Sequence, residues 1–211
     1  MNIVSKITEA VPVSVEIANN PASLNAIHQK GCAAVVWSRQ TPPEIQTWID
    51  DLPPKYLPSG RVIITPEMIA ETVKDLFDAV GMLSGSEREW LHADITSLAG
   101  TFSRLMSAKY LRLRLDVVTN NACLKFHVDA VTSRLICTYR GSGTQYGLST
   151  NGSDPTRIFQ AKTGSPILLR GTLWPAKSPV ELRHRSPPIE GTGETRLVLV
   201  LDPVSNLEEE M

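Results

Sequence analysis

The chain has 211 residues, of which 42% are hydrophobic and 20% charged, so it can bury a sizeable core and is not disordered as a whole. Lysine and arginine number 21 against 22 aspartate and glutamate residues, a balance that argues against bulk attraction to nucleic acid or anionic lipid. No apolar run approaches the roughly 18 residues of a membrane span. We therefore expect a cytoplasmic protein without a nucleic-acid or membrane partner.

The first residues and the cysteines argue against a secreted protein and against a small protein held together by disulfides or zinc. The segment MNIVSKITEAVPVSVEI lacks the basic start and long apolar stretch of a secretory signal. The three cysteines are odd in number and widely spaced, which argues against a disulfide scaffold or a four-cysteine zinc site. The expectation is a single domain over residues 1–211.

Helical patterns dominate the first half, residues 1–108. CAAVVW at 32–37 predicts a short strand, and TPPEIQTWIDDL after it predicts a short helix with prolines at its entry. Between 66 and 108, apolar residues recur at helical spacing in two runs, which SGSERE at 84–89 separates. The apolar faces are Ile69, Val73, Leu76, Phe77 and Val80 in the first run and Leu91, Ile95, Leu98, Phe102 and Leu105 in the second.

Strand patterns dominate from residue 109 to 204. YLRLRLDVV at 110–118 alternates apolar with polar residues, as a half-buried strand does. Turn-rich stretches such as GSGTQYG and SPPIEGTGE separate the strand candidates that follow. These candidates are 122–129, 134–140, 157–161, 166–170, 179–184 and 195–201. The prediction is an α+β protein in which helices support an antiparallel sandwich or barrel.

The segment CLKFHVDA carries a candidate metal site. On a strand, residues two apart project from one face, so His127 and Asp129 can converge on one ion. His184, at the end of a later strand, is placed to supply a third ligand. Two histidines and one carboxylate on one face of a metal leave three positions open, as in non-haem Fe(II) oxygenases.

Twelve positions after His184, Arg196 opens the apolar strand RLVLVLD. A guanidinium at the head of an apolar strand needs an anionic partner, and a bound dicarboxylate would supply one through a two-pronged pairing. A structural salt bridge to Glu194 or Asp202 is the alternative.

The HxD motif, the distant His and the Arg that follows resemble the Fe(II)/2-oxoglutarate-dependent dioxygenase superfamily over roughly residues 110–202. The resemblance implies a double-stranded β-helix (jelly-roll or cupin-like) core and Fe(II) held by His127, Asp129 and His184. It also implies 2-oxoglutarate bound by Arg196, and RLICTYRGSGT at 134–144 resembles the strand on which a Tyr, here Tyr139, lines the co-substrate pocket. No catalytic residue beyond the metal ligands is implied, and the substrate, a small molecule or a protein, is left open.

One position departs from this pattern. Many members carry Ser or Thr two residues after the arginine to share the co-substrate carboxylate, and here that position is Val198. Tyr139, Tyr110, Thr138 and Arg114 remain alternative partners for that carboxylate.

The whole chain also resembles an uncharacterised bacterial family of unknown function that is associated with zinc-homeostasis neighbourhoods. The same His/Asp/His set binds Zn(II) well. A non-catalytic zinc-binding protein on the same fold is therefore the alternative function.

Other candidate groups favour structural roles. His92 and Asp94 form a second HxD, but on a helix such residues point about 200° apart and do not share an ion easily. His28 has no companion ligand, and GSGT at 141–144 lacks the lysine of a phosphate-binding loop, so it predicts a flexible turn or an active-site lid.

Overall fold

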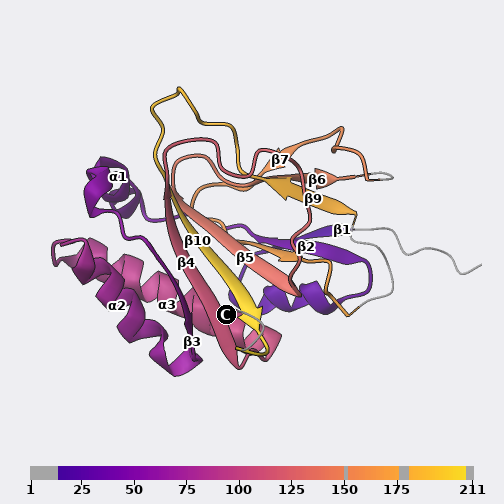
Figure 1. The fold of residues 1–211 in the computed structure, drawn as a ribbon, viewed down its shortest axis with the longest axis horizontal. Coiled ribbons are helices and arrows are strands. Elements are labelled where there is room, and N and C mark those ends of the chain that lie inside the picture. Colours follow the sequence, from indigo (N-terminus) through magenta and orange to yellow (C-terminus); the bar gives the residue numbers. More distant parts are fainter. Residues whose placement is uncertain (1–13, 150–151, 176–180, 208–211) are drawn as a thin grey trace, which may run out of the picture.

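A computed structural model describes residues 14–149, 152–175 and 181–207. Most of the segment on which the secretory-signal argument rests, residues 1–13, lies outside these ranges. No helix among the described residues has both the length and the apolar character needed to cross a membrane. The architecture is a large sheet, a smaller sheet and a helical layer (Figure 1), which confirms the predicted α+β class.

The large sheet has seven strands, and all neighbours are antiparallel except β1 and β2. Along the sheet the order is β1 (Ser14–Ala18), β2 (Cys32–Trp37), β8 (Ile167–Arg170), β5 (Ser133–Arg140), β10 (Arg196–Val204), β4 (Tyr110–Val118) and β3 (Gly60–Ile64). Strand β10 lies between β5 and β4, and eight of its nine residues are buried. The last strand of the chain therefore runs through the middle of the molecule.

The smaller sheet has three strands in the order β7 (Phe159–Gln160), β6 (Gln145–Leu148) and β9 (Leu182–Arg185). Tyr146 and Leu182 from this sheet pack with Ile136, Ile167 and Val198 from the large one. The two sheets thus share an apolar core in the space between them.

The strand predicted at 122–129 is not a regular strand. The segment runs beside β9 and forms one isolated bridge, in which His127 and His184 exchange two backbone hydrogen bonds of 3.0 Å. Ser186 N also donates to Cys123 O. Ser186 lies two residues after His184, whereas Cys123 lies four residues before His127, so the two segments are out of step. This shift in register interrupts the ladder and explains the difference from the prediction.

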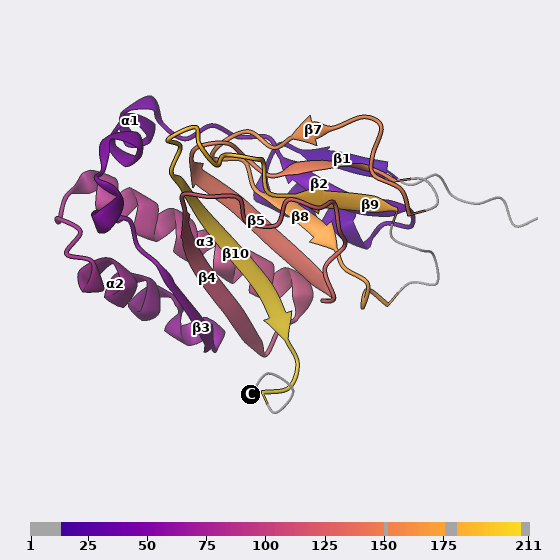
Figure 2. The same ribbon diagram turned by 45° about the horizontal axis from the view of Figure 1, so that its top comes forward.

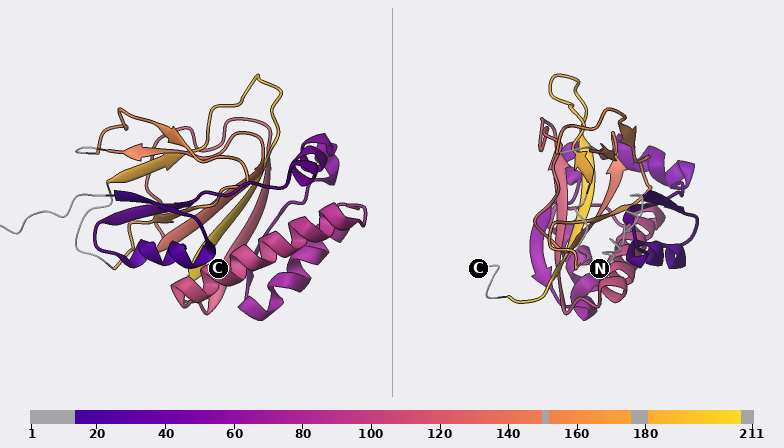
Figure 3. Two further views of the ribbon diagram at one scale, coloured as in Figure 1. Left: turned by 180° about the vertical axis from the view of Figure 1, so that it is seen from behind. Right: turned by 90° about the vertical axis from the view of Figure 1, so that its right-hand side faces the viewer.

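Helices cover the outer face of the large sheet, behind β4, β5 and β10 (Figures 2 and 3). The α-helices are α1 (Pro43–Asp51), α2 (Ile69–Ala79) and α3 (Ser86–Met106); 3-10 turns lie at Pro21–His28, Pro54–Tyr56 and Pro66–Met68. The predicted apolar faces are those that pack: Phe77 of α2 and Ile95 and Phe102 of α3 are fully buried. The helix over 41–52 is confirmed as well, and of the separating segment 84–89 the first two residues lie between the helices while 86–89 form the first turn of α3.

Alternation along the central strands divides two environments. In β10, Leu197, Leu199 and Leu201 belong to the core against the helices, whereas Val198 and Val200 belong to the core between the sheets. Strands β4 and β5 alternate in the same way, because paired residues on neighbouring strands project from the same face of the sheet. The polar residues of YLRLRLDVV consequently face the space between the sheets.

Candidate metal centre

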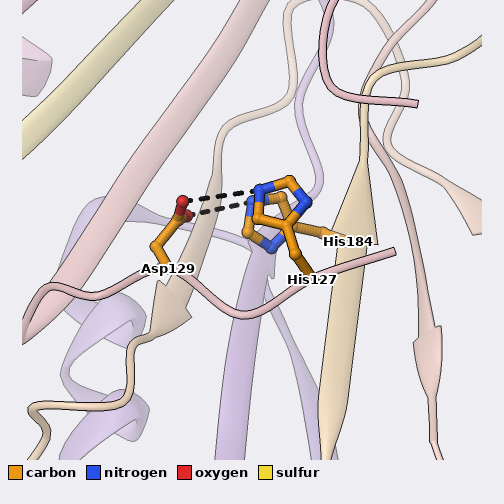
Figure 4. Close-up of side chains that lie close together, drawn as sticks. All are labelled: His127, Asp129 and His184. Carbon is orange, nitrogen blue, oxygen red and sulfur yellow. Dashed lines mark ion pairs between the residues drawn. The ribbon is translucent and has the colours of Figure 1, made fainter. Parts of the chain in front are cut away.

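Three side chains meet at one end of the inter-sheet space, and in Figure 4 both histidine rings face the Asp129 carboxylate. His184 Nε2 lies 3.0 Å from Asp129 Oδ2, and His127 Nε2 lies 3.5 Å from Asp129 Oδ1. One ligand atom from each of the three residues lies within 4.8 Å of the others. Among the described residues, this is the one group of histidine, cysteine and acidic side chains that could hold a metal ion. Two ligand atoms about 2.1 Å from one ion, at right angles, lie about 3 Å apart. We call these three residues the triad.

The local backbone explains this convergence. The bridge between His127 and His184 places their rings side by side, with centroids 4.5 Å apart. Asp129, two residues on, turns its carboxylate toward both rings. The predicted convergence of the triad is therefore what the structure contains, although an irregular segment carries two of the three residues.

The two histidines differ in environment. His127 Nδ1 lies 2.8 Å from the carbonyl oxygen of Lys125, an arrangement that places the proton on Nδ1 and leaves Nε2 as the ligand atom. The nearby Asp129 carboxylate, 3.5 Å from Nε2, stabilises the charged ring and raises the pKa of His127 above the ordinary value. Burial lowers the pKa of His184, against the opposing effect of Asp129, so its ring favours the neutral form that binds metals.

The Asp129 carboxylate is charged and incompletely satisfied. Burial tends to raise its pKa, but His127, His184 and Arg134 outweigh burial and hold the pKa well below its ordinary range. Arg134 binds Oδ1. Oδ2 is buried without a hydrogen-bond partner, because the nearby His184 nitrogen does not approach it in hydrogen-bonding geometry. A buried carboxylate oxygen without a partner, 3.0 Å from one imidazole nitrogen and on a carboxylate that both rings face, fits a divalent cation.

Arg134 is a site residue that the sequence analysis missed. Its Nε and Nη2 donate to Asp202 at 2.6 and 2.8 Å, while Nη1 reaches Asp129. Asp202 is 1% exposed, so the pair is fixed inside the protein. One signal in the sequence could have identified it: Arg134 is a polar residue five positions after Asp129, and it lies on the face of β5 that points away from the helices.

Arg196 opens β10, as predicted, and is 1% exposed. Its Nε donates to Ser142 O at 2.6 Å, and Nη2 lies 3.4 Å from Thr138 Oγ1. Neither Glu194 nor Asp202 forms a salt bridge with it, and among the described residues no carboxylate lies within ion-pair distance of its guanidinium. Burial lowers its pKa, with Glu194 opposing the shift from a distance. A buried, unpaired guanidinium is costly unless an anion completes it.

The GSGT turn holds Arg196 in place. Glu194 accepts hydrogen bonds from the backbone N–H and the hydroxyl of Ser142, whose carbonyl in turn accepts from Arg196. Gly141 has a φ of +75°, and a Cβ there would lie 2.9 Å from Arg196 Cγ. The segment predicted to be a flexible turn or lid is thus held by hydrogen bonds, and strand β6 begins directly after it at Gln145.

The alternative partners for a co-substrate carboxylate lie in different places. Thr138 pairs with Val198 across β5 and β10, so its hydroxyl is beside the position where many dioxygenases carry Ser or Thr. Tyr110 pairs with Val204, at the far end of β10 from Arg196. Thr138 alone of the two is placed beside Arg196.

Tyr139 lies on the opposite face of β5, which corrects the expectation that it lines the pocket. Its hydroxyl donates to Asp94 Oδ2 at 2.6 Å, and Asp94 also accepts two hydrogen bonds from Arg39. The side chain is fully buried against the helical layer. The alternation that points Thr138 toward the inter-sheet space points its neighbour away from it.

The histidines assigned structural roles do not join the triad. His92 Nε2 lies 2.8 Å from Ala70 O, while Asp94 binds Arg39 and Tyr139 instead of His92. His28 Nε2 lies 3.2 Å from Leu105 O. Both rings contact backbone oxygens within the helical layer.

A cavity of about 230 Å³ connects the triad to Arg196. The apolar residues Ile136, Val198 and Val200 form part of its wall. The polar residues Thr144 and Arg114 also line it. The metal ligands and the unpaired guanidinium therefore share one compact space.

Two plant proteins of known structure share this architecture. The rice dioxygenase for auxin oxidation is 14% identical with a TM-score of 0.52, and the match covers 93% of this chain and 84% of that one. The Arabidopsis thaliana dioxygenase for auxin oxidation 1, solved with 2-oxoglutarate, is 10% identical with a TM-score of 0.53 over 93% and 94% of the two chains. The fold is accordingly the double-stranded β-helix of the 2-oxoglutarate–Fe(II) oxygenases.

The sequence itself places the chain in a narrower group. Residues 18–202 match the DUF1826 family, described as a protein of unknown function, and the chain belongs to that family. Comparison with curated proteins gives no significant match.

Proposed function

We propose that this protein is an Fe(II)- and 2-oxoglutarate-dependent oxygenase, most simply a hydroxylase. The observation that carries the proposal is Arg196, a buried guanidinium that has no acidic partner among the described residues and that lines the same cavity as the triad. A metal site alone does not explain an unpaired charge of this kind, whereas a dicarboxylate spanning the cavity does.

The triad would hold the iron on one face. His127 Nε2, His184 Nε2 and one oxygen of Asp129 supply the ligands, and the Lys125 carbonyl and Arg134 fix two of them from behind. Two histidines and one carboxylate are the protein ligands that non-haem Fe(II) oxygenases use.

Arg196 would hold the far carboxylate of 2-oxoglutarate. The Ser142 carbonyl fixes its Nε, which leaves guanidinium N–H groups for the bound anion, and the Thr138 hydroxyl lies beside them. When bound, iron and 2-oxoglutarate supply the oxygen-activating chemistry. The protein's own part is to orient both groups and to exclude water with the apolar wall of Ile136, Val198 and Val200.

The test is anaerobic reconstitution with Fe(II) followed by addition of 2-oxoglutarate. We expect a weak visible charge-transfer band in the parent protein. Arg196→Met should keep the metal but need much more 2-oxoglutarate to develop the band, and Asp129→Ala should lose the metal. Absence of the band in an iron-loaded parent would refute the proposal.

The triad also supports the second candidate, a non-catalytic zinc-binding protein, because the same ligands suit Zn(II). Tight zinc retention together with no measurable affinity for 2-oxoglutarate would favour that function. Release of succinate from 2-oxoglutarate by the iron-loaded protein would exclude it.

A further inference from the structure

Arg114, in the middle of β4, is a second guanidinium in the cavity that forms no ion pair within the part of the chain that the structure describes. Its side chain faces the inter-sheet space and lines the same cavity as the triad. Its Nε is buried and has no hydrogen-bond partner, and no ion pair with any described residue satisfies its charge. Leaving a charged group partly buried in this way is unfavourable unless a ligand completes it.

The nearby carboxylate is already engaged. Asp202 binds Arg134 through both of its oxygens and lies 3.5 Å from Arg112 Nη1. Burial and the neighbouring charge of Arg134 both disfavour the charged form of Arg114, and Asp202 and Asp116 only partly offset this. Arg114 therefore lies where burial and positive charge outweigh the nearby negative charge.

The cavity as a whole has an excess of positive charge. Its lining contains four arginines and two aspartates: Arg114, Arg134, Arg185, Arg196, Asp116 and Asp129. In the proposed oxygenase, the metal is balanced by Asp129 and one end of 2-oxoglutarate, and Arg196 by the other end. Arg134 is balanced by Asp202. Asp116 is then the one acidic residue left in this lining for Arg114 and Arg185, so one positive charge still lacks a partner.

The position of Arg114 separates it from the co-substrate arginine. Arg114 pairs with Val200 in β10, four residues along the strand from Arg196 and one strand further across the sheet. Four residues of extended strand span about 13 Å. An anion at Arg114 would therefore be a different group from the carboxylate at Arg196.

We propose that Arg114 binds a carboxylate or phosphate group of the primary substrate, which is a small anionic molecule. This inference rests on the proposed function, since it assumes that Arg196 is occupied by 2-oxoglutarate. The cavity of about 230 Å³ is smaller than the pockets that enclose drug-sized ligands. It holds the co-substrate and only the reacting part of a compact second molecule, whose anionic group lies against β4.

The experiment titrates inorganic sulfate, a dianion that binds metals weakly, into zinc-loaded protein saturated with 2-oxoglutarate. Calorimetry should show millimolar sulfate binding to the parent and at least tenfold weaker binding to Arg114→Met, with Arg114→Lys between them. Arg104→Met is the matched control, because it removes one positive charge from an exposed position on α3 and should bind sulfate as the parent does. Affinity for 2-oxoglutarate should be unchanged in all three variants.

Stability measurements separate this role from a structural one. Removing an unpaired cation should leave the melting temperature of Arg114→Met equal to the parent's or higher, whereas loss of a structural arginine would lower it. Equal sulfate affinity in the parent and Arg114→Met would overturn the proposal, as would a parallel loss of 2-oxoglutarate affinity in that variant. If the parent does not bind 2-oxoglutarate, the proposed function fails, and sulfate titration in an Arg196→Met background still decides the role of Arg114.

Discussion

Replacing Thr138 by Val tests how the protein compensates for Val198. The substitution keeps the shape of the side chain and removes the hydroxyl that lies 3.4 Å from Arg196 Nη2. A hydrogen bond from this hydroxyl to the charged carboxylate of bound 2-oxoglutarate would contribute about 1.5–3 kcal/mol, and we take the lower limit. We expect affinity for 2-oxoglutarate to fall about tenfold, which corresponds to about 1.4 kcal/mol.

The assay is calorimetric titration of 2-oxoglutarate into zinc-loaded protein. Thr138→Ser should bind as the parent does, because it retains the hydroxyl. In the Thr138→Val background, Val198→Thr should restore affinity, since the two positions are paired neighbours across β5 and β10. Unchanged affinity in Thr138→Val would show that the hydroxyl does not share the carboxylate, and failure of the second substitution to rescue would contradict the cross-strand compensation.

Three further predictions concern the site and its support. Alanine at any triad position should abolish stoichiometric metal binding in elemental analysis, whereas His92→Ala should leave it intact. In denaturant unfolding, Gly141→Ala should lower the free energy of unfolding by more than the roughly 1 kcal/mol expected for a left-handed residue, and it should also weaken 2-oxoglutarate binding. Gly191→Ala is the control, because its φ is +79° and the space around its Cβ is open, so it should lower the free energy of unfolding without weakening 2-oxoglutarate binding. Cys123 should react with a thiol reagent in the folded protein, while buried Cys137, with a pKa raised to about 12, should react only after unfolding; equal labelling of both thiols would contradict the burial.

Side-chain periodicity carried most of the information that was correct at the level of the sequence. The apolar faces of α2 and α3 follow directly from it, as do the described strands from 133 onward except β6, which begins in a stretch interpreted as a turn. The triad was predictable because HxD on an extended segment restricts where the two ligands point. Tyr139 was misplaced because a sequence does not reveal which face of a buried strand meets the helices and which meets the cavity.

Two other features required the tertiary structure. The bridge at His127 interrupts a strand that the pattern alone presents as regular, since the shift in register depends on the partner β9. The arginines of YLRLRLDVV suggest a solvent-facing side by their polarity, yet Arg112 is buried and Arg114 faces the cavity. Polar residues on a half-buried strand face either bulk water or a ligand, and composition does not distinguish the two.

The alternation along β10 has a consequence for how such a protein diversifies. Leu197, Leu199 and Leu201 determine whether the helical layer stays attached, whereas Arg196, Val198 and Val200 contact whatever occupies the cavity. Substitutions at every second position can therefore alter the accepted ligand while the stabilising half of the strand stays constant. Insertion or deletion of a single residue in β10 would exchange the two sets at once. Descendants of this chain are thus free to vary by replacement along β10 but not by a change in its length.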